Sequence, residues 1–307
     1  MVRCMARWPT LAVLAALVFA TSGAGAPRAL DWKRAAPLPL PRSEVAASTL
    51  GSELVVLGGF LADGRSSARV DAYSPARNRW RRLPSLPVAV NHAVAASDGK
   101  RLYLLGGYGA PKRAYAFSQG RWRRLPDLPE PRAAAGAAIV GRTLYVVGGV
   151  ADGGLAQDSL AFDRLRKRWS RIPGPKPREH LGVTALGGRV YAAAGRDTGT
   201  NFDAFQAFVP ANRRWVSLAR VPETRGGTDV AAIGKTIVSA GSESSAGTSA
   251  AVYRYDLRTK RWSRLPDLPT ARHGLGVVAL GGRVYVVGGG PTPGLSVSGA
   301  NEFLTLR

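Results

Sequence analysis

Arginine recurs at one position of a repeated pattern in this 307-residue sequence. Five arginines stand nine or ten residues after a tryptophan, where a proline-rich segment leads into an apolar strand, and Val90 takes the remaining position. They are Arg42, Arg132, Arg178, Arg225 and Arg272. A guanidinium has forked donors that match a carboxylate, phosphate or sulfate. If the repeats form a ring, these side chains gather round one mouth of its channel and predict an anion-binding site there. The alternative is a structural role, in which each arginine bonds to neighbouring loop carbonyls.

The three histidines of the sequence fall close to the same positions. His92 and His180 stand two residues after their column position, as Glu44 does, and His273 stands one residue after it. Imidazoles bind zinc or copper when they converge. These three come from the second, fourth and sixth units, so we expect a symmetric ring to space them around the channel. The sequence therefore predicts that they are polar lining of a ligand pocket, with no metal site.

Two carboxylates are the candidates for acid–base chemistry, Asp229 and Glu179. Asp229 replaces a small residue of the innermost strand close to Arg225, which favours an ion pair over a general base. Tyr108 and Arg196 directly follow the small-residue pairs that end the second strands. We expect these two side chains to add a stacking surface and a charge to the same pocket.

The elements that position these residues repeat six times. In each unit a hydrophobic strand ends in a small-residue pair, and a tryptophan follows about twenty residues later. The pairs are Gly58-Gly59, Gly106-Gly107, Gly148-Gly149, Ala194-Gly195, Ala240-Gly241 and Gly288-Gly289. The sixth pair lacks its tryptophan, and an unmatched Trp32 precedes the first pair. A missing last strand at one end and a spare one at the other predict a closed ring.

Each unit contains four short strands and no sustained 3.6-residue apolar period. The first strand is rich in Gly and Ala, so we expect it nearest the axis, where little volume is available for side chains. The fold class is therefore all-β, a six-bladed β-propeller whose last blade is completed by a strand around Trp32. The expected repeats are 42–89, 90–131, 132–177, 178–224, 225–271, and 272–307 together with 30–36.

The di-glycine after a hydrophobic strand, the following aromatic residue and the tryptophan period resemble the kelch repeat, which builds β-propellers. The resemblance covers residues 30–307 and is weaker in units four and five, where Ala194 and Ala240 replace the first glycine. In kelch domains that capture acidic peptides, arginines at the start of the innermost strand line the pocket. The resemblance implies the same role for the arginine column of this sequence.

Residues 1–26 predict an export signal that is cleaved near residues 24–26, because a basic start, ten apolar residues and a run of small residues follow one another. The apolar stretch is too short to span a bilayer. Cys4, the only cysteine, lies ahead of it, so the processed chain (27–307) is expected to have no disulfide and no tyrosine–cysteine cofactor of the kelch copper oxidases. We expect a periplasmic or extracellular monomer without a cofactor.

The formal net charge of +23 predicts a polyanionic partner. No motif indicates specific nucleic-acid recognition. The predicted function is an exported binding protein that holds an anionic small molecule, an acidic polysaccharide or an acidic protein segment at one mouth of the channel. The alternative is a sugar epimerase or mutarotase that resembles N-acetylneuraminate epimerase, with Asp229 or Glu179 as the acid–base residue.

Overall fold

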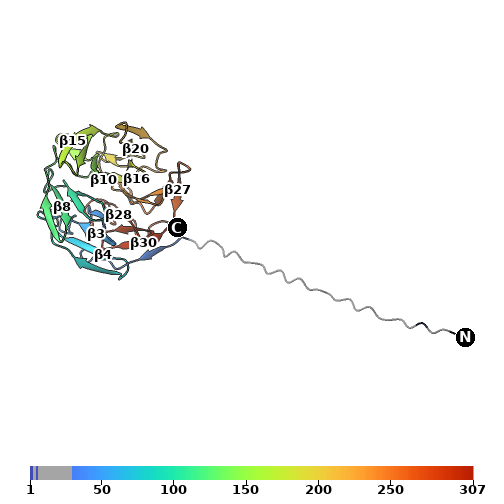
Figure 1. The fold of residues 1–307 in the computed structure, drawn as a ribbon. Coiled ribbons are helices and arrows are strands. Elements are labelled where there is room, and N and C mark those ends of the chain that lie inside the picture. The colour runs from blue at the N-terminus through green and yellow to red at the C-terminus, as the bar shows by residue number, and fades with distance from the viewer. Residues whose placement is uncertain (3–4, 6–29, 307) are drawn as a thin grey trace.

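The computed structural model describes residues 1–2, 5 and 30–306. Most of the predicted export signal, with its cleavage region and Cys4, lies outside the described residues. Within them, no helix is long and apolar enough to cross a membrane. The described chain is all-β, and six antiparallel four-stranded sheets surround one axis, as Figure 1 shows. The predicted six-bladed propeller is therefore confirmed.

The first three blades run outward from the axis in chain order. Alternating strands with small or β-branched side chains, joined by two-residue turns, favour this meander. Blade one contains β2 (Ala46–Leu50), β3 (Glu53–Leu57), β4 (Val70–Ser74) and β5 (Arg79–Arg82); blade two contains β6 (Val94–Ser97), β7 (Leu102–Leu105), β8 (Ala114–Ser118) and β9 (Arg121–Arg124); blade three contains β10 (Gly136–Val140), β11 (Thr143–Val147), β14 (Asp158–Asp163) and β15 (Arg168–Pro173).

The other three blades follow the same order, and the last borrows its outer strand. Blade four contains β16 (Gly182–Leu186), β17 (Arg189–Ala193), β20 (Phe205–Val209) and β21 (Arg214–Ser217); blade five contains β22 (Asp229–Ile233), β23 (Thr236–Ala240), β26 (Val252–Asp256) and β27 (Arg261–Leu265); blade six contains β28 (Gly276–Leu280), β29 (Arg283–Val287), β30 (Asn301–Thr305) and β1 (Trp32–Arg34).

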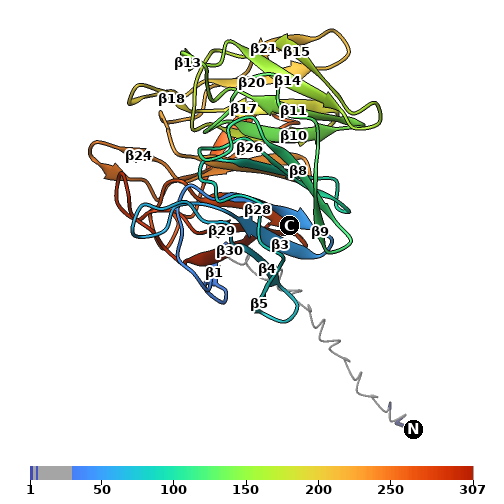
Figure 2. The ribbon, with the colours of Figure 1, turned by 90° about the vertical axis from the view of Figure 1, so that its left-hand side faces the viewer.

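Three small hairpins stand between the second and third strands of blades three, four and five. They lie on one side of the ring in Figure 2, which we call the hairpin face. They are β12 (Val150–Ala151) with β13 (Gly154–Leu155), β18 (Arg196–Asp197) with β19 (Thr200–Asn201), and β24 (Glu243–Ser244) with β25 (Gly247–Thr248).

Ring closure depends on Trp32, as the repeat arithmetic predicted. Strand β1 pairs antiparallel with β30, and Trp32 lies opposite Leu304. The indole is buried, and its Nε1–H donates to the carbonyl of Pro266 in the preceding blade at 2.8 Å. The two ends of the described propeller chain therefore lie side by side in one sheet (Figure 2).

The tryptophan period has the same physical cause in every blade. Each outer-strand indole donates its N–H to a backbone carbonyl in the linker of the preceding blade, at 2.7 to 3.0 Å. Five of these indoles also pack on an aromatic residue of the third strand, with ring centroids 4.8 to 5.4 Å apart. Each tryptophan thus fastens its blade to the one before it.

The innermost strands need small residues where they converge. A Cβ added at Gly136, Gly182 or Gly276 would collide with the innermost strand of the neighbouring blade. This close approach brings the starts of the six innermost strands together on the axis. It also determines which side chains can meet there.

Candidate functional site

Six residues form a hydrogen-bonded ring around the axis, one just ahead of each innermost strand. All six have left-handed backbone conformations, with φ between 48° and 68°: Glu44, His92, Ala134, His180, Gly227 and Gly274. From His92 to Gly274, each amide donates to the carbonyl of its counterpart in the preceding blade, at 2.8 to 3.2 Å. The amide of Val45 closes the ring onto Gly274 at 3.3 Å. Residues more than 200 positions apart in the chain are thereby neighbours.

Three members of the ring keep a polar side chain in spite of this backbone. A left-handed conformation costs a non-glycine residue about 1 kcal/mol or more, and glycine occupies it in blades five and six. At Glu44, His92 and His180 the strained conformation occurs in residues with ionisable side chains. Ala134 shows that the ring itself needs this backbone, and the polar side chains at the other three positions are additional to it.

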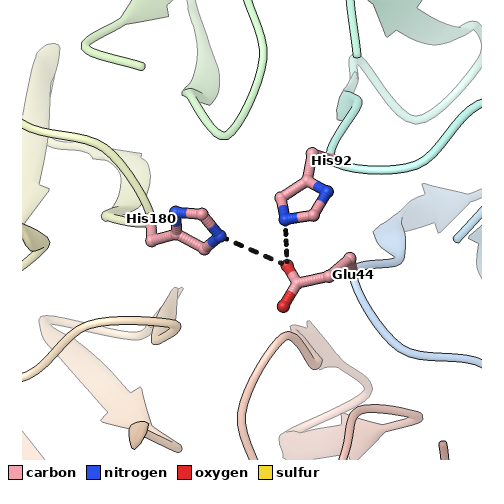
Figure 3. Close-up of side chains that lie close together, drawn as sticks. All are labelled: Glu44, His92 and His180. Atoms are coloured by element: carbon pink, nitrogen blue, oxygen red, sulfur yellow. Dashed lines mark ion pairs between the residues drawn. The ribbon is translucent and has the colours of Figure 1, made fainter. Parts of the chain in front are cut away.

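The three polar side chains meet on the axis, as Figure 3 shows. Oε2 of Glu44 lies 3.4 Å from Nε2 of His92 and 3.8 Å from Nε2 of His180. Oε1 of the same carboxylate lies 3.3 Å from Nδ1 of His273. The prediction that the ring spaces the histidines apart was therefore wrong. The ring is so narrow that side chains from alternate blades reach one carboxylate.

The nitrogens that face away from Glu44 are held by protein acceptors. Nδ1 of His92 lies 2.6 Å from the side-chain oxygen of Asn91, and Nε2 of His273 lies 3.1 Å from the carbonyl of Thr292. An acceptor oxygen requires the facing nitrogen to carry the hydrogen. In the neutral form of both rings, the inward nitrogen therefore presents a lone pair to Glu44.

Arg196 is the only guanidinium in direct contact with this cluster among the described residues. Its NH1 donates to Oε1 of Glu243 at 2.6 Å, its Nε lies 3.3 Å from Oε1 of Glu179, and its NH2 lies 3.1 Å from Nε2 of His180. Oε2 of Glu243 lies 3.3 Å from Nδ1 of His273. Arg196 thus pairs with two carboxylates, Glu179 and Glu243, while Glu44 pairs with the imidazoles. The cluster has an excess of negative charge when the imidazoles are neutral.

Burial and neighbouring charges fix the protonation of the central groups. Burial alone would raise the pKa of Glu44, but the three imidazoles around it hold this pKa well below its usual range. Burial lowers the pKa of His92 to about 4. Burial also opposes the charged form of His273, but the carboxylates of Glu44 and Glu243 outweigh it and raise that pKa. Near pH 7, Glu44 is an anion and His92 is neutral.

The cluster forms the floor of an open pocket of about 310 Å³ on the hairpin face. Phe60 and Leu295 form an apolar rim, and Phe60 and the neighbouring Tyr108 each pack edge-on against the ring of His92, with centroids 5.5 and 5.3 Å away. Tyr108 is 44% exposed, and Leu295, which lines the pocket, is 54% exposed. The pocket has room for one side chain or a small ligand. The residues that line it are Glu44, Phe60, Gly64, His92, Arg196, Glu243, His273, Gly294 and Leu295.

Comparison with protein-family models agrees with this architecture. The model of the KLHDC2/KLHL20/DRC7 Kelch-repeats domain matches residues 114–289, more than half of the chain, and the model of the Kelch motif matches residues 41–87. The chain belongs to the kelch-repeat family. Kelch propellers are in general scaffolds for protein interactions. No curated protein matches the sequence.

In this kelch propeller the arginine column lies inside the blades, so the prediction that it surrounds the pocket was wrong. Arg42, Arg132, Arg178, Arg225 and Arg272 are 0 to 1% exposed. Arg42 shows why: its NH1 donates to the carbonyls of Gly58 and Arg69, and its NH2 pairs with Asp71 at 2.5 Å. These groups belong to the second and third strands of its own blade. The column satisfies strand-end carbonyls, which is the structural alternative stated above.

Asp229 does not pair with Arg225, which bonds instead to Glu223 and to groups of its own blade. The two carboxylate oxygens of Asp229 accept the amides of Val230 at 2.8 Å and of Val277 in the next blade at 2.9 Å. Burial raises the pKa of Asp229 to about 7, against the opposing effect of these two hydrogen bonds. The side chain lies deeper in the channel than the pocket, between cavities of about 90 and 320 Å³.

The other predicted site residues belong to the axial cluster. Glu179, Arg196, Tyr108 and the three histidines lie in or against the axial cluster. Glu243 was missed because blade five was aligned one residue early. The structure shows that the pair in blade five is Gly241-Ser242. The amide of Ser242 donates to the carbonyl of Arg272, which is the hydrogen bond that the second glycine makes in the other blades. Glu243 is then the counterpart of Arg196, and each bridges to the residue after its column arginine.

Proposed function

We propose that this kelch propeller is a binding module whose partner docks on the hairpin face and inserts one segment into the axial pocket. The observation that carries the proposal is the pocket itself, an apolar and partly exposed rim above a floor of ionised groups. Such a combination gives affinity through the rim and specificity through the floor. Two of the three hairpins, β18–β19 and β24–β25, add Arg196 and Glu243 to the floor.

Charge limits which group of the partner can reach the floor. The floor holds three carboxylates, Glu44, Glu179 and Glu243, and one guanidinium, Arg196, so an acidic side chain would be repelled there unless a cation were also present. The acidic partner expected from the net charge is better matched by the outer strands. Arg79, Arg121 and Arg214 are exposed on the circumference, where a polyanion would bind in a salt-dependent way.

The sugar-epimerase alternative is not favoured by any contact in the channel. Asp229, its best acid–base candidate, has both carboxylate oxygens bonded to backbone amides, and the cavity that separates it from the pocket measures only about 90 Å³. Small-molecule sites in proteins usually exceed about 300 Å³. We propose that the protein acts outside the cytoplasm, on the basis of the amino-terminal sequence alone.

Selection of peptides tests the pocket. A phage library of random peptides would be selected on the protein, and the enriched peptides would be measured on variants at physiological salt. We expect Phe60→Ala and Leu295→Ala each to weaken binding at least tenfold, because each removes apolar surface from the rim. Leu165→Ala is the matched control, since Leu165 is 76% exposed and lies in the turn between β14 and β15. Equal binding to all variants, or no enrichment, would reject the proposed docking site.

A further inference from the structure

We propose that Glu44, His92 and His180 bind a divalent transition-metal ion such as Zn²⁺ on the propeller axis. The inference concerns the floor of the pocket and does not depend on which partner docks above it. It begins with three ligand atoms, Oε2 of Glu44 and Nε2 of each histidine, that lie within 4.8 Å of one another. They come from three different blades and are fixed by the hydrogen-bonded ring of backbone amides.

The spacing of the atoms fits first-row metal coordination. Zinc bonds to imidazole nitrogen and carboxylate oxygen are about 2.0–2.1 Å long, so two ligands of a tetrahedral ion lie about 3.3–3.4 Å apart. Oε2 of Glu44 lies 3.4 Å from Nε2 of His92 and 3.8 Å from Nε2 of His180. The two histidine nitrogens lie within 4.8 Å of each other, so the side chains must move closer together for an ion to bond to all three ligand atoms.

The orientation of the imidazoles gives a second, independent argument. A metal-binding histidine almost always donates its other ring N–H to a protein acceptor, which turns the free lone pair toward the ion. His92 does so with Asn91. For His180 the outward Nδ1 lies 3.2 Å from a carboxylate oxygen of Glu179, near enough for an ionic contact, but it makes no hydrogen bond there. Without a cation, the lone pair of His92 faces the anionic oxygen of Glu44, and two acceptors oppose each other.

Charge favours a cation at this position. The three carboxylates of the cluster face one guanidinium, Arg196, so an excess of negative charge remains even when His273 is protonated. The side chains of Glu44 and Glu243 are about one-tenth exposed, and uncompensated charge is expensive at such depth. A divalent ion neutralises the excess. Arg196 is also its competitor, because its NH2 now lies 3.1 Å from Nε2 of His180.

The donor set indicates the class of metal. Two imidazoles and one carboxylate suit zinc, cobalt, nickel or copper(II), whereas magnesium and calcium prefer oxygen ligands alone. Three protein ligands leave at least one coordination position open, which is typical of sites where an ion binds a further group. In this protein two of the three ligand residues, Glu44 and His92, also line the pocket that contains Phe60 and Leu295. A carboxylate of a docking segment is the group that such an ion accepts.

The chain offers an unusually clean experiment because it has three histidines in total, and all three surround Glu44. Full-length protein without a histidine tag is stripped with a chelator and titrated calorimetrically with ZnCl₂ near pH 7.5. A parallel titration with CoCl₂ is followed in the visible spectrum. We expect one ion per chain with micromolar or tighter affinity, and cobalt bands of the intensity that four- or five-coordinate ions show.

Variants then locate the ion. His92→Gln and His180→Gln are each expected to weaken zinc binding at least 100-fold, about 2.7 kcal/mol. His273→Gln should weaken it less than tenfold, because His273 faces the other oxygen of Glu44. Glu53→Gln is the control and should bind as the wild type does, because Glu53 begins the second strand of blade one and pairs with Arg81, away from the cluster.

Circular dichroism and thermal melting establish that each variant is folded before it is titrated. Should a histidine variant fail to fold, the cobalt spectrum of the wild-type protein still decides. A spectrum that stays that of the hydrated ion overturns the proposal, and so does zinc binding that survives both His92→Gln and His180→Gln.

Discussion

Replacing Asp229 with asparagine is expected to change the pH dependence of stability more than the stability itself. The carboxyl group lies at the start of β22, on the channel, with both oxygens bonded to backbone amides. Burial raises its pKa in the folded chain from the ordinary 3.8 to about 7. Asparagine has nearly the same shape and no charge, so the variant removes the titration and keeps much of the packing.

The sign follows from linkage. Below about pH 4 the carboxyl is protonated in both states, and Asp229 adds no pH dependence. Between pH 4 and 7 the unfolded chain ionises while the folded chain keeps its proton, so the wild type loses stability as pH rises. The loss levels off above pH 7. Three pH units at about 1.4 kcal/mol each give a loss on the order of 4 kcal/mol.

Urea unfolding followed by tryptophan fluorescence measures this difference. Wild type and Asp229→Asn are compared at pH 4 and at pH 8, and the difference between the two differences cancels the titration of all other groups. We expect the variant to gain several kcal/mol over the wild type at pH 8 relative to pH 4. A difference that does not change with pH would refute the reasoning, because it would mean that the two amides stabilise the ionised carboxylate as much as burial opposes it.

Three further outcomes follow from the fold and the cluster. Trp32→Ala removes the indole that fastens β1 to the ring and should cost about 3–5 kcal/mol in urea unfolding; a loss under about 1 kcal/mol would contradict closure through this strand. Arg272→Met leaves the buried Glu302 unpaired and should cost about 3–5 kcal/mol, whereas the exposed control Arg261→Met should stay within about 0.5 kcal/mol; equal small losses would contradict the structural role of the column. Arg196→Met removes the group that competes for an imidazole nitrogen, so zinc affinity should rise severalfold in calorimetry; weaker binding would show that the guanidinium supports the site.

The fold could be predicted from the sequence because it depends on spacing alone. Each indole must reach the carbonyl of the preceding linker, so Trp80, Trp122 and their successors recur at the period of one blade. Trp32 has no small-residue pair before it, and Gly288-Gly289 has no tryptophan after it. Both observations are explained if the strand around Trp32 completes the last blade, as it does.

The site was harder to predict because it depends on directions that spacing does not fix. A side chain at the start of an innermost strand can point along its own blade, as Arg178 does, or toward the axis, as His180 does two residues later. The left-handed backbone at His180 makes that difference, and the adjacent residues of the sequence do not predict this conformation. The recurring arginines therefore predicted a positively charged channel mouth, whereas the structure has carboxylates and imidazoles there.

Glu243 could have been found from the sequence by a stricter count. In the other blades the second residue of the small pair stands seventeen positions after the start of its unit, as Gly195 does after Arg178. The same count from Arg225 ends on Ser242 and makes Glu243 the counterpart of Arg196. Gly241 is the first member of the pair in blade five, but the sequence analysis placed it second, because a glycine occupies the second position in all other blades.

Anomalous diffraction at the zinc edge tests the central claim most directly. Crystals of the full chain grown with one equivalent of zinc should show a single strong peak on the propeller axis, bonded to Oε2 of Glu44 and to Nε2 of His92 and His180. An axis without a peak, or peaks confined to carboxylates on the circumference, would contradict the account.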